Sequence, residues 1–141
     1  MSKDQISPHE GANYRLDAPV VSRRDGVLRA DDFDDLYFDA HHGLAESQHV
    51  FIDGTNLREK LCDSNHLTIA ETGFGTGLNF LAAWKAWRET QPTTSKLRFY
   101  TIEAFPLTVK QSFDSLKNFT ELGTYLRSFC SGYSKPTAEC Y

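Results

Sequence analysis

The chain has 141 residues, of which 40% are apolar and 13% aromatic, and its formal net charge is −4. This is the length and composition of about one globular domain rather than of a disordered chain. The acidic balance excludes a general electrostatic attraction to nucleic acid or to an anionic membrane surface, so any such contact has to be local.

Cysteine usage and the N-terminus predict a cytoplasmic protein. Cys62, Cys130 and Cys140 are odd in number and form no C-x-x-C pair, which argues against a disulfide framework and a zinc site. The sequence has no run of 18 apolar residues, and its polar N-terminus lacks the apolar core of a secretory signal. We therefore expect reduced thiols and no membrane span.

Residues 1–60 are predicted to form an N-terminal extension of β-ribbon and loop. The stretch VVSRRDGVLRA places Asp25 and Gly26 between apolar runs, which is a hairpin signal. The stretch VFIDG repeats this pattern with Asp53 and Gly54 and predicts a second hairpin. A helical turn is expected around residues 31–38.

Residues 61–141 read as the first half of a parallel α/β domain. HLTIAE, residues 66–71, predicts a strand that runs into a glycine turn. Apolar residues then follow at three- and four-residue spacing from Gly77 until Pro92, which predicts a helix with Trp84 and Trp87 packed in the core. LRFYTIE, residues 97–103, predicts the second strand.

Two further helices are expected after the second strand. Pro106 is predicted to open one whose apolar face is formed by Leu107, Val109, Phe113 and Leu116. Leu122, Tyr125, Leu126 and Phe129 recur at helical spacing and predict the other. The resulting β-α-β-α order leaves the edges of a two-stranded sheet unpaired. We therefore expect an incomplete, Rossmann-like doubly wound fold with a β-hairpin extension.

The sequence GFGTG, residues 73–77, follows the first predicted strand of this unit. Glycine permits a positive φ angle and removes the Cβ atoms that keep a ligand away from the backbone. A dinucleotide fingerprint needs a further glycine where Leu78 stands, and a P-loop needs Gly-Lys-Ser or Gly-Lys-Thr. Phosphate-binding interpretations are therefore disfavoured, and a tight turn without a ligand stays open as the alternative.

An acid before G-x-G-x-G and another at the end of the next strand resemble the arrangement of class I S-adenosylmethionine binders. The bare turn would pack against the adenosyl and methionyl parts, and Glu71 would attract the cationic amino group of the cofactor. Glu103 would accept hydrogen bonds from both ribose hydroxyls, as an acid does in dinucleotide-binding folds. A solvated strand end is the alternative for each acid.

Longer stretches carry a more specific resemblance. AETGFGTGLNFLAAW, with FDDLYF, GLAESQHVFIDGTNL and TIEAFPLT, resembles the methyltransferase domain of the bifunctional tRNA-modifying MnmC family over about residues 15–141. The resemblance implies methylation of 5-aminomethyl-2-thiouridine to 5-methylaminomethyl-2-thiouridine at the wobble position of tRNA, with S-adenosylmethionine as cofactor. FAD would belong only to a separate oxidase domain outside this chain.

The resemblance also implies roles for individual residues. Tyr37 and Phe38 would be walls for the adenosine or the target base, with packing beneath a loop as an equally weighted alternative. Glu103 would be the ribose acid. The residues implied for the cofactor loop are Glu71, Gly73, Gly75, Gly77 and Asn79.

The chain also departs from the family pattern. Family members continue with a segment resembling DGFxPxxNPxxW that supplies the catalytic aspartate, and no such segment occurs in residues 1–141. No catalytic residue is therefore assigned, and a truncated, inactive N-terminal portion is expected. The alternatives are a non-catalytic remnant that binds the cofactor or a partner chain, and a class I methyltransferase with another acceptor.

Two charged clusters match no specific binding motif. His41, His42, Glu46 and His49 lack the spacing of a known zinc motif, so we predict no metal site. The arginines at positions 15, 23, 24 and 29 form a local basic cluster that suits either a solvated hairpin or a contact with tRNA phosphate.

Overall fold

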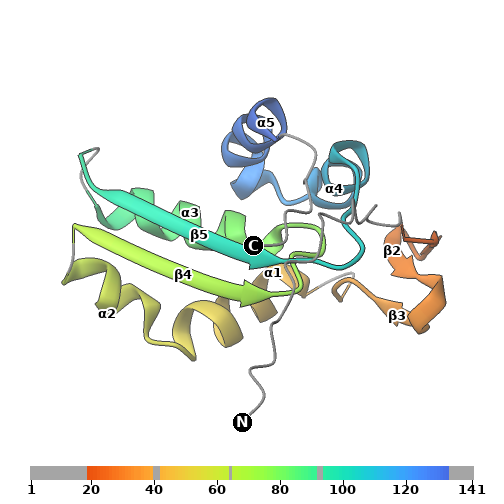
Figure 1. Ribbon diagram of the computed structural model, residues 1–141, viewed down its shortest axis with the longest axis horizontal. Helices are drawn as coiled ribbons and strands as arrows, with labels where there is room; N and C mark the ends of the chain where they lie inside the picture. Colours follow the sequence, from red (N-terminus) through yellow and green to blue (C-terminus); the bar gives the residue numbers. More distant parts are fainter. Residues whose placement is uncertain (1–18, 40–41, 64, 92–93, 134–141) are drawn as a thin grey trace, which may run out of the picture.

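The computed structural model describes residues 19–39, 42–63, 65–91 and 94–133. These residues form a small antiparallel sheet, a group of helices and a parallel pair of strands, which confirms the predicted α/β class (Figure 1). The antiparallel sheet lies beyond the carboxyl ends of the parallel strands (Figure 1). This arrangement places residues 30–37 beside the glycine turn.

The antiparallel sheet is built on the predicted hairpin. Asp25 and Gly26 both have positive φ angles, 49° and 83°, as a tight two-residue β-turn requires. The expected helical turn is a short 3₁₀ helix, and a third strand that the sequence did not reveal pairs with the hairpin. The elements are β1 (Val21–Arg24), β2 (Val27–Ala30), η1 (Asp31–Phe33) and β3 (Asp35–Leu36).

The second predicted hairpin is wrong, because the chain there is helical. The elements are α1 (Gly43–Ser47), the π-helical segment η2 (Gln48–Asp53) and α2 (Leu57–Cys62). Gly54 has a φ of −62°, so it does not form a left-handed turn. Glycine is required because a Cβ atom at this position would lie 2.6 Å from the Val50 carbonyl oxygen.

The parallel unit follows the predicted order closely. Its elements are β4 (His66–Thr72), α3 (Leu78–Thr90) and β5 (Lys96–Ile102), and the register runs from His66 opposite Lys96 to Thr72 opposite Ile102. α3 lies behind the sheet (Figure 1). The opposite face is exposed, with Tyr100 at 61% and Ile102 at 75% exposure. Only one face of this sheet is therefore packed by the described residues.

The core gathers around α3. Leu81 and Ala83 are fully buried, and Trp87 is 2% exposed. Trp84 is only half-buried and packs against Tyr125, with ring centroids 5.4 Å apart. The predicted packing role of both tryptophans is thus confirmed, with Trp84 at the edge of the core.

The last helices are α4 (Val109–Leu116), the 3₁₀ helix η3 (Thr120–Leu122) and α5 (Gly123–Gly132). The prediction that Pro106 opens a helix is wrong, because α4 begins after Thr108. The Thr108 hydroxyl accepts the backbone N–H of Gln111, and the Gln111 side chain accepts the backbone N–H of Thr108. The capping box fixes the start of α4. The buried residues of α4 are Ser112, Ser115 and Leu116, whereas Phe113, predicted on the apolar face, is 39% exposed.

The capping box gives a test of this helix boundary. Thr108→Ala should lower the free energy of unfolding by about 1 kcal/mol, because it removes the N-cap acceptor. Thr108→Ser keeps the hydroxyl and should retain most of the stability. Urea unfolding followed by circular dichroism measures both variants, and equal losses in the two would contradict the capping role.

Candidate functional site

The glycine turn joins the end of β4 to the start of α3. Gly73, Gly75 and Gly77 have φ angles of 81°, 53° and 85°, which are left-handed values that glycine adopts readily. The Gly77 N–H donates to the Phe74 carbonyl at 2.9 Å, which closes the turn. The Gly73 N–H donates to the Ile102 carbonyl at 2.7 Å, which fastens the turn to the end of β5.

The three glycines differ in what surrounds them. A Cβ atom at Gly77 would lie 2.9 Å from the Phe74 ring, and one at Gly75 would lie 3.3 Å from the Tyr37 ring. A Cβ atom at Gly73 would meet nothing within 4 Å. Gly77 therefore serves packing and the start of the helix, whereas Gly73 leaves backbone open to a ligand.

Glu103 follows β5 and holds the glycine turn through one of its carboxylate oxygens. Its Oε2 accepts the Gly75 N–H at 2.9 Å, and its Oε1 accepts the Phe105 N–H at 2.9 Å. Each carboxylate oxygen has a second acceptor position. Glu103 can therefore fasten the turn and still accept a hydroxyl donor.

Glu71 is a half-buried acid at the end of β4. The pKa of Glu71 is raised to about 7, mainly by burial; the Asn79 contact lowers it, and the charge of Glu103 adds to the rise. Asn79 Nδ2 lies 3.5 Å from Glu71 Oε2, a long contact, and Glu71 Oε1 is buried without a hydrogen-bond partner. The site therefore contains a carboxylate oxygen that lacks a donor.

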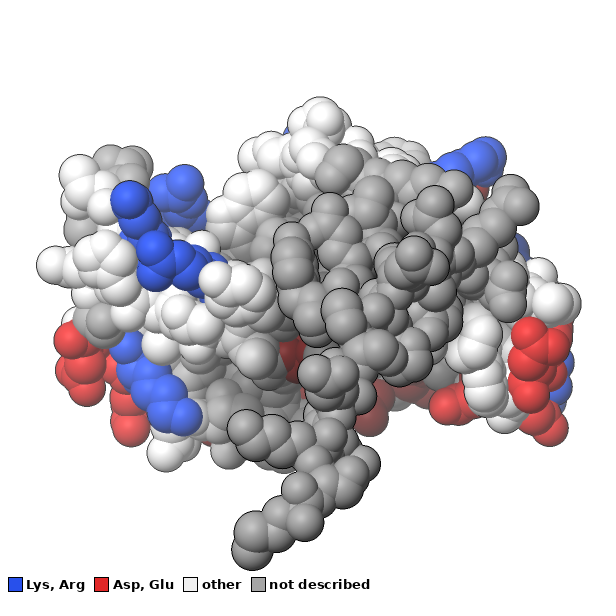
Figure 2. Space-filling model, viewed as in Figure 1, with Lys and Arg blue, Asp and Glu red and all other residues white. Residues whose placement is uncertain are grey.

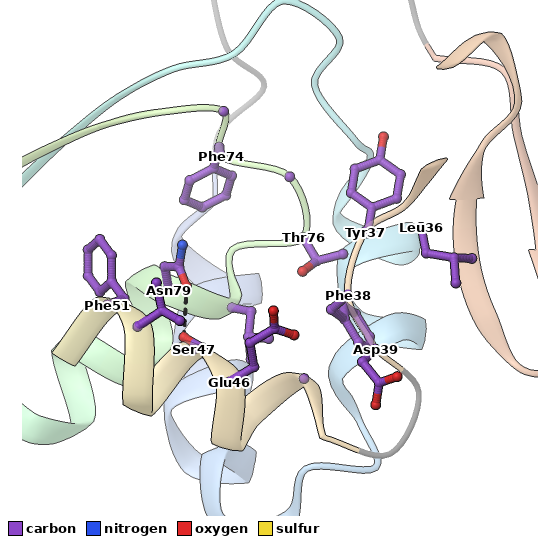
Figure 3. Close-up of a pocket in the computed structure, with 15 residues that line it drawn as sticks. Leu36, Tyr37, Phe38, Asp39, Glu46, Ser47, Phe51, Phe74, Thr76 and Asn79 are labelled. Atoms are coloured by element: carbon purple, nitrogen blue, oxygen red, sulfur yellow. Dashed lines mark hydrogen bonds between the residues drawn. The ribbon is translucent and has the colours of Figure 1, made fainter. Parts of the chain in front are cut away.

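The larger pocket at this site has a volume of about 570 Å³. Three segments line it: residues 36–39 before α1, the α1–η2 segment, and the glycine turn with the start of α3 (Figure 3). Asp39 and Glu46 contribute carboxylates, and the described residues that line the pocket include neither lysine nor arginine. This lining suits a neutral or cationic ligand better than a phosphate.

A smaller pocket of about 310 Å³ also adjoins the glycine turn. Both pockets are lined by Gly73, Gly75 and Tyr37, and the smaller one also includes Glu103. The glycine turn and the Tyr37 ring therefore adjoin two spaces, one with Glu46 and Asn79 and one with Glu103.

The structure brings the predicted cofactor residues together at the carboxyl ends of β4 and β5, while their roles stay predictions. Tyr37 lies against Gly75 and lines both pockets. Phe38 lines the larger pocket and also packs against Phe119, with ring centroids 5.6 Å apart. Neither Glu71 nor Gly77 is among the residues that line these two pockets.

Sequence reasoning missed the contribution of α1 and η2. Glu46 and Ser47 line the larger pocket, and the Ser47 hydroxyl donates to Asn79 Oδ1 at 2.7 Å (Figure 3). The missed signal is helical spacing, because the buried positions Leu44, Ser47 and Ile52 recur at intervals that a strand does not produce. The interpretation of VFIDG as a hairpin concealed it.

The two charged clusters of the sequence analysis lie only partly within the described residues. No group of three or more His, Cys, Asp or Glu side chains there could hold a metal ion, and His41 lies outside them. Arg29 pairs with Asp31 and Asp34, whereas Arg15 lies outside the described residues. Basic and acidic side chains lie near each other at both ends of the face in Figure 2.

The helices within the described ranges are short, and α3 spans 13 residues. None of them is long and apolar enough to cross a membrane.

Several curated relatives carry the name tRNA 5-methylaminomethyl-2-thiouridine biosynthesis bifunctional protein MnmC. The protein from Marinomonas sp. (strain MWYL1) is 37% identical over 124 residues, which are 86% of this chain and 18% of the relative. The protein from Acinetobacter baylyi is 38% identical over 113 residues, 77% of this chain and 18% of the relative. The chain thus spans less than a fifth of the length of these relatives.

A solved structure shows the same fold. The crystal structure of MnmC2 from Aquifex aeolicus matches with a TM-score of 0.56 and 21% sequence identity, over 68% of this chain and 33% of that chain. No protein-family model matches the sequence.

The glycine environments predict unequal costs of substitution. Gly73→Ala should cost about 1–2 kcal/mol, because only the left-handed backbone resists the new side chain. Gly77→Ala should cost more, because its Cβ atom would also displace the Phe74 ring at 2.9 Å. Urea unfolding of both variants measures the difference, and equal losses would contradict the packing role of Gly77.

Glu71 predicts a pH dependence of stability. Its pKa is about 7 in the folded protein against an ordinary value of 4.5, so the folded state keeps a proton that the unfolded state has lost between these pH values. Stability should therefore fall as pH rises through this window. Glu71→Gln removes the effect and should gain stability relative to wild type between pH 4.5 and pH 8. A difference in urea midpoint between Glu71→Gln and wild type that does not change with pH would contradict this prediction.

Proposed function

Because the chain belongs to the MnmC family, we propose that its glycine turn binds S-adenosylmethionine for the methylation of an aminomethyl group on wobble uridine of tRNA. The observation that carries the proposal is the buried Glu71 Oε1, which lacks a hydrogen-bond partner beside an open glycine backbone. A cationic amino group would supply the missing donor.

The residues present fit this cofactor. Gly73 leaves space for close approach, and the larger pocket is lined, among the described residues, by carboxylates without lysine or arginine. A phosphate ligand would meet carboxylates there, whereas a sulfonium cofactor with an ammonium group carries charge of the opposite sign. When bound, S-adenosylmethionine supplies an electrophilic methyl group.

Each side chain has a defined task in this proposal. Glu71, as a carboxylate, holds the ammonium group by a charge-assisted hydrogen bond. Glu103 accepts ribose hydroxyls with the acceptor positions that its backbone bonds leave unused. Tyr37, which lines both pockets and lies against Gly75, forms a wall for the adenosine or the target base.

The acceptor side of the reaction places one chemical demand on the protein. An amine attacks a methyl group only when it is neutral and aligned with the breaking bond, so its proton must be removed and its approach restricted. The larger pocket provides a restricted space next to the turn. We assign no proton acceptor among the described residues.

Calorimetric titration with S-adenosylmethionine tests the binding proposal. Wild type should bind S-adenosylmethionine and S-adenosylhomocysteine, and should bind ATP much more weakly, because the described part of the pocket lining presents carboxylates and no cationic side chain. Gly73→Ala should abolish binding, since its methyl group fills the open approach to the turn. Equal or tighter binding of ATP would contradict the proposal.

Gly26→Ala is the matched control for that variant. Gly26 also has a positive φ, and a Cβ atom added there would meet nothing within 4 Å, but it lies in the β1–β2 turn. Both alanine variants should lose similar stability, while only Gly73→Ala loses the ligand. Transfer of a labelled methyl group to tRNA that carries 5-aminomethyl-2-thiouridine then tests the reaction.

A further inference from the structure

We propose that Ser47 is a positioning residue for the cofactor site, which acts through the Asn79 amide on the Glu71 carboxylate. The proposal rests on the proposed function, in which Glu71 holds the ammonium group of S-adenosylmethionine. Ser47 itself need not touch the cofactor. Its task is to fix which end of the Asn79 amide faces Glu71.

The three side chains form a connected series across the site. The Ser47 hydroxyl, at the end of α1, donates to Asn79 Oδ1 at 2.7 Å, and Asn79 Nδ2 lies 3.5 Å from Glu71 Oε2. Ser47 is 7% exposed, so water has little access to replace its hydroxyl. The first bond is short, whereas the second is long. The orientation of the amide is therefore set mainly from the Ser47 side.

The chemistry of a primary amide explains why this orientation matters. One end of the Asn79 amide accepts hydrogen bonds and the other donates them. While Ser47 donates to the oxygen end, the NH₂ end faces Glu71. A rotation of the amide by half a turn would place its oxygen against the carboxylate, and two acceptors would then repel each other.

The electrostatics of Glu71 show what the NH₂ group contributes. Burial raises the pKa of Glu71, the Asn79 contact lowers it, and the charge of Glu103 raises it further. Ser47 and Asn79 do not titrate. The neighbouring charge that acts on Glu71 is therefore that of Glu103. Asn79 is thus the group that keeps the carboxylate form accessible near neutral pH.

The consequence for the ligand is a specific pH dependence. With a pKa of about 7, half of the Glu71 side chains are ionised at pH 7. An upward shift of about half a unit would reduce the ionised fraction, and hence the affinity for an ammonium ligand, by about twofold at pH 7. The same shift would change the affinity by only about 6% at pH 8.5, where most of the carboxylates are ionised in both proteins.

The first experiment follows the side-chain carboxyl carbon of Glu71 by NMR during a pH titration without ligand. Ser47→Ala should raise the pKa of Glu71 by about half a unit, because the released amide no longer presents its NH₂ group reliably. Ser47→Thr should restore the wild-type value, since it keeps the hydroxyl. Ser47→Cys, which has a weak donor of similar size, should also raise the pKa of Glu71. It takes the place of the alanine variant if that variant does not fold.

Ser115→Ala is the matched control. Ser115 is also 7% exposed, and its hydroxyl donates to the Gln111 carbonyl within α4, away from the glycine turn. This variant should lose packing and a hydrogen bond without moving the Glu71 titration. A shift of the same size in Ser115→Ala would overturn the assignment to Ser47.

The second experiment measures S-adenosylhomocysteine affinity at pH 7 and pH 8.5. Ser47→Ala should weaken binding about twofold at pH 7 and by much less at pH 8.5. An unchanged Glu71 titration in Ser47→Ala would overturn the positioning role, whether or not the cofactor binds. A shifted titration with no cofactor binding in wild type would instead overturn the proposed function on which this role rests.

Discussion

The parallel pairing of β4 with β5 is the constraint on which the site depends. The register runs without interruption to Thr72 opposite Ile102, and the Gly73 N–H extends it by one more bond to the Ile102 carbonyl. Parallel strands end at the same edge of a sheet. Glu71 and Glu103, which are far apart in the sequence, therefore meet at the glycine turn. An antiparallel pair would send the two acids to opposite ends.

Much of this arrangement could be predicted because its signals are local. Each strand of the parallel unit ends on or beside an acid, and the glycine turn stands between a strand pattern and a helical pattern. Residues 43–62 could not be predicted in the same way. Val50, Phe51 and Ile52 favour a strand by composition, yet Ile52 is 1% exposed within a helical segment packed in the core around α3. Tertiary packing decides between the two conformations there.

The site itself was only partly predictable, for a different physical reason. Sequence identifies which carboxylates end the strands, but it does not reveal the backbone donors that they meet. Glu103 binds the N–H groups of Gly75 and Phe105, and Glu71 is left with a buried oxygen that has no partner. The two acids therefore differ in environment, although both lie at the carboxyl end of a strand. Ser47 escaped notice because its helix was not recognised.

The bond between Glu103 and the Gly75 N–H also affects the entropy of binding. The turn contains three glycines at positive φ, and in an unfastened loop a ligand would have to order them on arrival. Here the bonds to Glu103 and to the Ile102 carbonyl hold the turn in the folded protein before any ligand is present. The ordering cost then belongs to folding, and a ligand that docks on Gly73 meets a preorganised backbone.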